Sequence, residues 1–393
     1  SFRRILEGLA SMAALGGFLG HFDMLFDAER NDCYERALRR AAEDLSVKIQ
    51  SGDEHHCVHA LDLGAGCGLL GLLAWRTCAF RGVTFLEANP LLAEALRGNL
   101  KRNHGAEIDC TVWEGSSFDV LPAKKIMETE EQRPGSGSKP RAISASPPFS
   151  LCVSELLDSA LIGEGVLPTL RAALQTPWLD PKKTVFIPAK ARIIATVFAS
   201  TELFARHRLS CKAELSGGIK FPEIFRKCHG LHAAEHLNLE PFLDAGLLEF
   251  VSDPFEVFSF HFAECAKIPA EGRTAEVLVR LRPGACAHGV AFWFDAHLYA
   301  DIHLNMAPQI GRQHLPTTFR DHWRQAVMCF PEPVKACSDG FELKLNAHHD
   351  DDAVWFTLLS QCPFPAATGT LPPSSMAVVA VPTPSPLPPW PPL

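Results

Sequence analysis

The stretch LDLGAGCGLLG, from Leu61 to Gly71, decides the fold class of this 393-residue chain. It completes the apolar run CVHALDLG (57–64), which is short and ends in glycine, as buried parallel strands do. The run LLGLLAWRT (69–77) then has the composition and spacing of a helix. A strand, a glycine turn and a helix in direct succession predict the first βα unit of an α/β domain.

The following segments continue this alternation. GVTFLEA (82–88) predicts a strand, NPLLAEALRGNLKRNHG (89–105) a helix that begins at Asn89 and Pro90, and DCTVWEG (109–115) a third strand. FSLCVSELL (149–157) predicts a fourth strand. The βαβαβ order predicts a right-handed, doubly wound parallel sheet.

The pattern changes from Thr184 onward, where β-rich runs follow one another without helices and predict a second, mainly antiparallel unit. Residues 201–250 interrupt this unit with helical spacing, as an interaction arm would. We therefore expect an N-terminal unit at 1–190 with a polar insertion at about 122–145, a second unit at 191–365, and a Pro-rich, disordered tail at 366–393. The first twenty residues predict an amphipathic helix rather than a signal or transit peptide.

The overall composition narrows the functional classes. A net charge of −8 disfavours direct nucleic-acid readout, and no apolar run is long enough to span a membrane. The 13 cysteines are odd in number and form no Cys-x-x-Cys pair, which favours reduced thiols and hence a cytoplasmic or nuclear protein.

The glycine stretch contains two overlapping ligand patterns. Gly66, Gly68 and Gly71 match a dinucleotide fingerprint, whereas Asp62 followed by Gly64 and Gly66 places an acid before the glycines. An acidic side chain at this position repels a pyrophosphate, whereas it attracts the ammonium and sulfonium groups of S-adenosylmethionine. The pattern favours S-adenosylmethionine over a nicotinamide dinucleotide, with Glu87 as the acceptor for its ribose hydroxyls. The structural alternatives are a cap for Asp62 and a surface acid for Glu87.

Two glutamates lie in the segment SELLDSALIGEG (154–165). Glu155 follows the predicted fourth strand, and Glu164 comes nine residues later between two glycines. A loop that returns the second carboxylate to the first would bind a guanidinium, which is flat, cationic and rich in donors. The alternative is two surface acids on a helix and a loop.

Five ordered segments resemble the motif set of protein arginine methyltransferases, and their amino-acid sequences are most similar to the type III, monomethylating branch. They are HFDMLFDAER (21–30), LDLGAGCG (61–68), FLEANP (85–90), SELLDSALIGEG (154–165) and FRDHWRQ (319–325). The resemblance implies a Rossmann-like S-adenosylmethionine domain, an antiparallel β-barrel domain and a helical dimerisation arm.

The resemblance also implies roles for individual residues. Glu155 and Glu164 would clamp the substrate guanidinium, and Asp27 with His322 would form a catalytic pair that acts as a proton relay, as a strut, or as both. Other residues would contact the cofactor or the substrate. The cofactor set is His21, Arg30, Asp62, Gly64, Gly66, Glu87 and Ser117, and the substrate set adds Met24, Trp323 and Gln325.

The implied reaction transfers a methyl group from S-adenosylmethionine to an arginine ω-nitrogen and leaves S-adenosylhomocysteine. The implied partners are histones or Arg/Gly-rich proteins and a second copy of the chain. Only two tyrosines occur, and Asp321 stands where other branches carry threonine; both departures favour monomethylarginine over dimethylarginine.

Three other readings remain from the sequence. Ser-Pro-Pro-Phe (146–149) resembles the loop of adenine or amide N-methyltransferases, although it precedes the predicted fourth strand. A weakly catalytic scaffold is a second alternative. HHCVH (55–59) and HHDDD (348–352) are rich in metal-ligand residue types, but neither has zinc-type spacing, and we expect no metal site.

Overall fold

The computed structural model describes residues 24–50, 59–77, 79–103, 109–118, 148–207, 234–309, 323–338 and 341–363. The expected N-terminal helix, the insertion at about 122–145 and the Pro-rich tail lie outside these residues, as does 208–233 of the predicted arm. No helix in the described part of the chain is long and apolar enough to cross a membrane.

The N-terminal unit is a five-stranded parallel sheet with the strand order β3-β2-β1-β4-β5. The predicted strand–helix alternation from residue 59 to 114 is confirmed. The unit comprises β1 (His59–Leu63), α3 (Leu69–Arg76), β2 (Gly82–Glu87), α4 (Pro90–Asn103), β3 (Asp109–Glu114), β4 (Leu151–Ser154), α6 (Val166–Leu174) and β5 (Val185–Ile187).

The register of this sheet aligns the strand ends that matter for function. Leu63 at the end of β1 is paired with Leu86 of β2 and with Ser154 of β4. The residues that follow, Gly64, Glu87 and Glu155, therefore leave the sheet at one carboxyl edge. In open parallel sheets this edge is where ligands bind.

The second unit consists of antiparallel strands in two sheets, one ordered β10-β14-β15 and the other β7-β13-β11-β6-β8, with β12 on β11 and β9 on β6. Phe292 of β11 packs edge-to-face on Phe356 of β15, so the two sheets share a core. Among the described residues the strands do not close into one barrel. The elements are β6 (Lys190–Ala199), α7 (Thr201–Arg206), β7 (Glu235–Leu237), α8 (Glu240–Asp244), β8 (Glu249–Phe250), β9 (Phe255–His261), η3 (Phe262–Lys267), β10 (Arg273–Leu281), β11 (Cys286–Tyr299), β12 (Ile302–Asn305), β13 (Gln325–Lys335), β14 (Phe341–His349) and β15 (Val354–Pro363).

One strand differs from the expectation drawn from the β-rich pattern. The apolar run from Thr184 was expected to open the antiparallel unit, but Val185–Ile187 forms β5 and pairs in parallel with β4. The antiparallel strands begin only with β6, after Pro188. An apolar run fits either kind of buried strand, so the sequence pattern alone does not separate β5 from β6.

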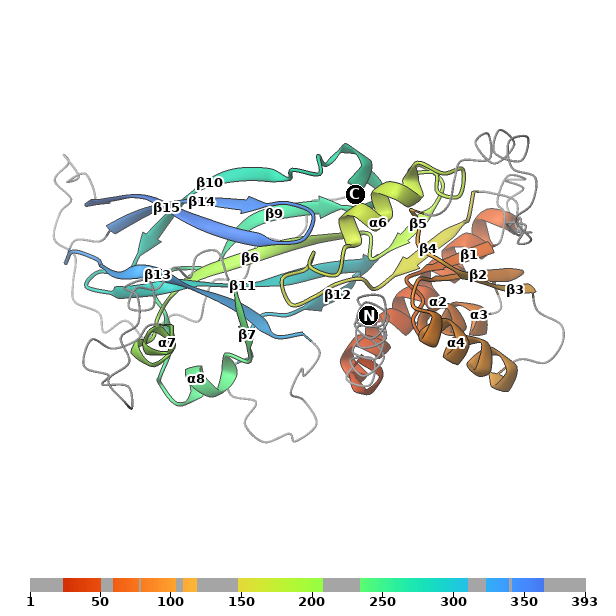
Figure 1. The fold of residues 1–393 in the computed structure, drawn as a ribbon, viewed down its shortest axis with the longest axis horizontal. Helices are drawn as coiled ribbons and strands as arrows, with labels where there is room; N and C mark the ends of the chain where they lie inside the picture. The colour runs from red at the N-terminus through yellow and green to blue at the C-terminus, as the bar shows by residue number, and fades with distance from the viewer. Residues whose placement is uncertain are drawn as a thin grey trace, which may run out of the picture.

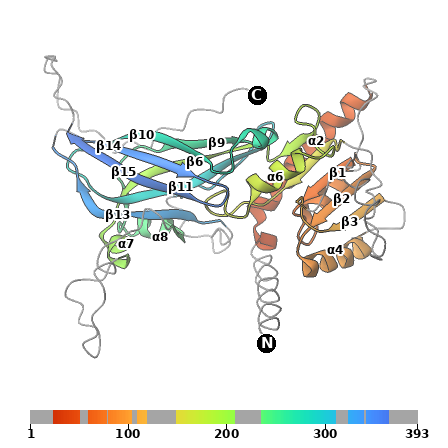
Figure 2. The same ribbon diagram turned by 45° about the horizontal axis from the view of Figure 1, so that its top comes forward.

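The two units lie side by side along the long axis of the molecule, with α2 (Ala28–Gln50) and α6 at their junction (Figures 1 and 2). Helix α2 packs against α3 and β5 of one unit and against β11 and β12 of the other. Its buried face includes Tyr34, Ala37 and Leu38, and one continuous apolar core runs through both units.

Candidate active site

The glycine turn after β1 is shaped by residues that adopt left-handed backbone angles. Gly64 has a φ of 76° and Gly68 a φ of 89°, conformations that glycine adopts without steric penalty. A Cβ on Gly64 would lie 2.5 Å from Leu156, directly after Glu155. The turn is therefore packed against the connection that carries the first glutamate.

Glu87 holds this turn from the neighbouring strand. One of its carboxylate oxygens accepts a hydrogen bond from Gly66 N at 2.6 Å, and the other accepts one from Asn89 N at 2.6 Å. Burial raises the pKa of this carboxyl group, whereas the backbone hydrogen bonds lower it. Because each carboxylate oxygen has two lone pairs, both can still accept a further bond from a ligand hydroxyl.

Asp62 lies beneath the turn rather than at its surface. Its side chain accepts a hydrogen bond from Gly71 N at 2.7 Å and so holds the first turn of α3, which is the capping role weighed against cofactor contact. Burial raises its pKa from 3.8 to about 7, although the bond from Gly71 lowers it.

The connection between β4 and α6 contains both predicted glutamates. Glu155 is buried directly after β4, and Glu164 is exposed in the turn just before α6. Asp158 shapes the loop between them by accepting hydrogen bonds from Ala160 N at 3.1 Å and Gly163 N at 2.9 Å. The predicted facing of the two carboxylates stays a prediction, but a defined loop connects them.

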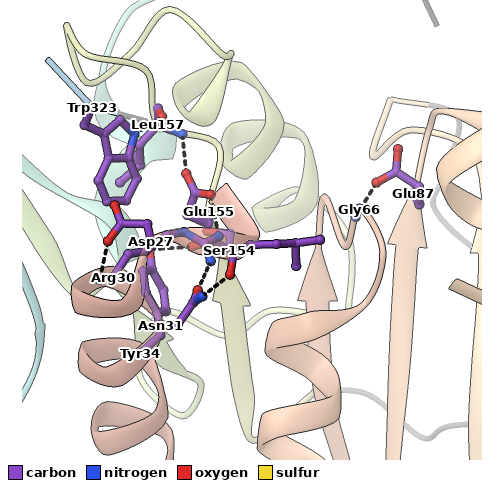
Figure 3. Close-up of polar contacts among 11 residues, drawn as sticks. Asp27, Arg30, Asn31, Tyr34, Gly66, Glu87, Ser154, Glu155, Leu157 and Trp323 are labelled. Atoms are coloured by element: carbon purple, nitrogen blue, oxygen red, sulfur yellow. Dashed lines mark hydrogen bonds and ion pairs between the residues drawn. The ribbon is translucent and has the colours of Figure 1, made fainter. Parts of the chain in front are cut away.

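Glu155 forms a buried ion pair with Arg30 of α2. Arg30 Nη2 lies 2.5 Å from Glu155 Oε2, and the two side chains are only 2% and 3% exposed (Figure 3). The family resemblance assigned these residues to different ligands, Glu155 to the substrate and Arg30 to the cofactor. In the structure Glu155 binds the guanidinium of Arg30, and its contact with a substrate arginine stays a prediction.

Two further residues support this pair, and neither was predicted as part of the site. Arg30 Nη1 donates to Asn31 Oδ1 at 2.7 Å, and the guanidinium lies 5.4 Å from the centre of the Tyr34 ring. The Tyr34 hydroxyl donates to Ser154 O at 3.2 Å, and burial raises its pKa well above 10.0. The sequence offered one signal for Tyr34: it comes four residues after Arg30, so in a helix both side chains lie on the same face.

Asp27 occupies the position just before α2. Its carboxylate accepts a hydrogen bond from Arg30 N at 2.9 Å, as an N-cap residue does. Met24 is half-buried on the turn that precedes it, and its carbonyl accepts from Asp27 N at 3.3 Å. His21 and His322, the other predicted members of this group, lie outside the described residues.

The segment from Trp323 to Gln325 joins the β4–α6 connection to the antiparallel unit. Trp323 is fully buried and donates through Nε1 to Leu157 O at 2.6 Å. Gln325 is also buried; its side chain accepts from Leu239 N at 2.9 Å and donates to Met306 O at 3.1 Å. Gln325 therefore connects two backbone segments, and its predicted contact with the substrate stays a prediction.

Ser117 follows β3 and is likewise buried. Its hydroxyl donates to Thr169 O in α6 at 3.0 Å. The segment after β3, which contains the predicted cofactor residue Ser117, is thus attached to the helix that begins after Glu164.

The described end of the alternative Ser-Pro-Pro-Phe motif lies at the opposite edge of the sheet. Ser146 and Pro147 are outside the described residues, but Pro148 and Phe149 precede β4. Phe149 is buried and packs on Trp178. This position is remote from the carboxyl edge that presents Gly64, Glu87 and Glu155, which argues against an amide or adenine site here.

The residues present fit S-adenosylmethionine. Among the described residues, Arg30 Nε is a buried donor without a hydrogen-bond partner, and it could donate to the carboxylate of the cofactor. The glycine turn and Glu87 lie at the same edge, as Figure 3 shows for Gly66. Arg30 would hold the carboxylate at the amino-acid end of that molecule, and Glu87 would hold its ribose hydroxyls beside the glycine turn.

Sheet topology and glycine turn together place the chain in the class of Rossmann-like methyltransferase folds joined to an antiparallel β unit. A solved structure described as Trypanosoma brucei PRMT1 enzyme-prozyme heterotetrameric complex with AdoHcy has the same fold, with a TM-score of 0.59 and 19% identity over 84% of this chain and 86% of that one. No protein-family model matches the chain.

Sequence comparison identifies similar proteins. The chain is 30% identical over 367 residues to Protein arginine N-methyltransferase 7 of Drosophila yakuba and 30% identical over 363 residues to the protein of that name from Drosophila melanogaster. Each alignment covers 88% of this chain and 48% of the relative, so the chain spans about half the length of the curated relatives it matches. Over nearly its whole length, the chain is therefore similar to one half of a protein arginine N-methyltransferase.

Proposed function

We propose that the chain transfers a methyl group from S-adenosylmethionine to an arginine ω-nitrogen of a protein and stops at monomethylarginine. The observation that carries this proposal is the buried carboxylate of Glu155, at the ligand-binding edge, 2.5 Å from a guanidinium nitrogen. A site that pairs a carboxylate with Arg30 has the charge and geometry to pair it with a substrate arginine.

The chain's own residues would bind and orient the substrate. The cofactor supplies an electrophilic methyl group on sulfur. A guanidinium has a pKa of about 13.8, so these side chains do not deprotonate it beforehand. Glu155 and Glu164 would instead concentrate its positive charge on two nitrogens and leave the third one free to attack. They would also fix that nitrogen in line with the methyl group, which lowers the barrier through orientation.

The experiment is a methyl-transfer assay with mass spectrometry. The full chain is incubated with labelled S-adenosylmethionine and either a histone or an Arg/Gly-rich peptide, and the product is analysed after short and long times. We expect monomethylarginine at both times. Dimethylarginine after long incubation would contradict the type III product, and methylated glutamine in the protein or peptide would support the amide-type alternative.

A weakly catalytic scaffold is the second candidate. The related solved structure is described as a complex of an enzyme with a prozyme. The presence here of both glutamates and Arg30 favours the enzyme. No methyl transfer to any arginine substrate would favour the scaffold.

We also propose that the chain forms a homodimer through residues 201–250 and acts in the cytoplasm or nucleus. The resemblance to the family supports the first point, and the odd number of scattered cysteines supports the second. Light scattering of the purified chain at several concentrations tests the dimer, and a monomer throughout would contradict it.

A further inference from the structure

The histidine- and aspartate-rich segment 348–352, set aside as a metal candidate, has another structural role. His348 and His349 point to opposite faces of their sheet: His348 bonds Thr357 and stacks on Trp355, whereas His349 packs against Phe258. The aspartates form the turn between β14 and β15. Asp350 accepts hydrogen bonds from Asp352 N and Ala353 N, both at 2.8 Å, and this turn presents the carboxylate of Asp351.

Asp351 forms a two-pronged ion pair with Arg171 of α6. Nη1 and Nη2 of the arginine lie 2.7 Å and 2.8 Å from the two carboxylate oxygens. Arg171 Nε also donates to Ile268 O, just after η3, at 3.2 Å. The two side chains are 17% and 18% exposed, so this pair is better shielded and better aligned than an ordinary surface pair.

Helix α6 connects this ion pair to both halves of the candidate site. Its N-cap is Gly165, the residue after Glu164, and Thr169 N donates back to Gly165 O at 3.1 Å. Thr169 O accepts the bond from Ser117. Arg171 lies about two helical turns from Glu164. In both ribbon views α6 lies between the two units, and it packs against η3 of the second unit (Figures 1 and 2).

We propose that Arg171 and Asp351 are a positioning pair through which the antiparallel unit fixes α6, and with it Glu164 and the Ser117 segment, for arginine binding. This inference rests on the proposed function, because it assigns Glu164 to the substrate. Neither residue touches the reacting atoms. Each acts through the helix, whose displacement would move the exposed Glu164 carboxylate away from the guanidinium while Glu155 stays paired to α2.

The test compares Asp351→Asn, Asp351→Glu and the control Glu276→Gln in the full chain. Glu276 pairs with Lys344 at 2.7 Å between β10 and β14 of the same sheet. We expect Asp351→Asn to lower kcat/KM for an Arg/Gly-rich peptide about tenfold, mainly through KM, because small displacements of binding groups have effects of this size. Asp351→Glu keeps the charge and should recover most of this loss, and Glu276→Gln should match the wild-type chain.

Two measurements separate positioning from loss of folded protein. The number of S-adenosylhomocysteine molecules bound per chain, measured by calorimetry, should stay unchanged in Asp351→Asn, whereas amide exchange over residues 163–175 should speed up. The proposal would be overturned if Asp351→Asn kept the wild-type KM and the wild-type rate of amide exchange. It would also be overturned if the activity fell only in proportion to the fraction of chains that bind S-adenosylhomocysteine. A wild-type chain that binds the ligand but methylates no arginine would overturn the proposed function, and the exchange result would still decide whether the pair holds α6.

Discussion

Glu155 and Arg30 belong to segments 125 residues apart, yet their side chains form a buried pair at 2.5 Å. Each charge stabilises the other, because a buried charge without a partner would raise the free energy of the folded chain. The pair also places a carboxylate of the predicted substrate clamp next to the arginine predicted to bind the cofactor. Substitutions at this pair should therefore affect folding and catalysis together.

Glu155→Gln should lower kcat for arginine methylation about 100-fold, since it removes the charge that orients the substrate. It should also lower the free energy of unfolding by about 3–5 kcal/mol, because Arg30 is left buried without its counter-charge. Steady-state kinetics and urea unfolding measure the two effects.

The matched control is Glu164→Gln in the same connection. Glu164 is exposed, so its amide variant should keep the free energy of unfolding within about 0.5 kcal/mol while losing methylation to a similar degree. Wild-type turnover in either variant would contradict the guanidinium clamp.

Asp62 should make stability depend on pH. Burial raises its pKa from 3.8 to about 7, so between these values the folded chain binds more protons at this group than the unfolded chain. Its contribution to the free energy of unfolding therefore falls as pH rises through this window and is constant above it. Asp62→Asn cannot ionise and can still accept the bond from Gly71.

Urea unfolding of both chains at a series of pH values from about 4 to 8 checks this expectation. The stability of Asp62→Asn relative to the wild-type chain should increase with pH and level off near pH 7. Curves that stay parallel would show that Asp62 is ionised as readily in the folded chain as in the unfolded one.

The location of the candidate site at the carboxyl edge of the parallel sheet could be predicted from the sequence. Gly64, Glu87 and Glu155 each lie at or just after the end of a recognisable buried strand. The Arg30–Glu155 pair, and the bond from Tyr34 to Ser154, could not be predicted. They depend on how α2 packs across the end of β4, which a pattern of local apolar spacing does not contain. Asp158 left a weak local signal as a turn-forming residue in a glycine-containing loop.

At the scale of elements, α2 depends on the cap that Asp27 provides to Arg30 N. Asp27→Ala should lower the free energy of unfolding by about 1 kcal/mol, whereas Asp27→Asn keeps a capping oxygen and should lose only a few tenths. Thermal unfolding measured by circular dichroism distinguishes the two variants.

The same pair of variants separates the two roles considered for Asp27 and His322. If the carboxylate takes part in proton transfer, Asp27→Asn should be folded but slow, with a changed pH profile of kcat. If Asp27 only supports the structure, Asp27→Asn should retain both the rate and the profile while Asp27→Ala loses stability.

The elements themselves were largely predictable in the N-terminal half, where strand, turn and helix signals alternate clearly. Glycine and proline mark the ends, as at Pro90 of α4. Prediction was weaker where two buried strands follow each other. Val185–Ile187 and Lys190–Ala199 read as one apolar run, and only their partners show that they belong to different sheets.

At the scale of the whole molecule, the two units share one apolar core that runs from α2 through the parallel sheet to the antiparallel strands. Such a core should make both units unfold together, because neither can lose its structure without exposing part of the other. Phe294 is a point of contact between them: it packs edge-to-face on Trp323, whose indole bonds to Leu157 O in the β4–α6 connection. The sequence did not indicate this shared core, since it predicted two units with a boundary.

Phe294→Ala and Phe292→Ala test this cooperativity from neighbouring positions of β11. Both side chains are fully buried, and Phe292 packs on Phe356 inside the antiparallel unit. Each substitution should lower the free energy of unfolding by about 3–5 kcal/mol through the cavity it leaves. In a single cooperative body, Phe292→Ala should speed amide exchange in β2 as much as in β14, although Phe292 belongs to the other unit. Faster exchange confined to the antiparallel strands, with a second calorimetric transition for the parallel sheet, would mean that the units unfold independently and that α2 does not join them.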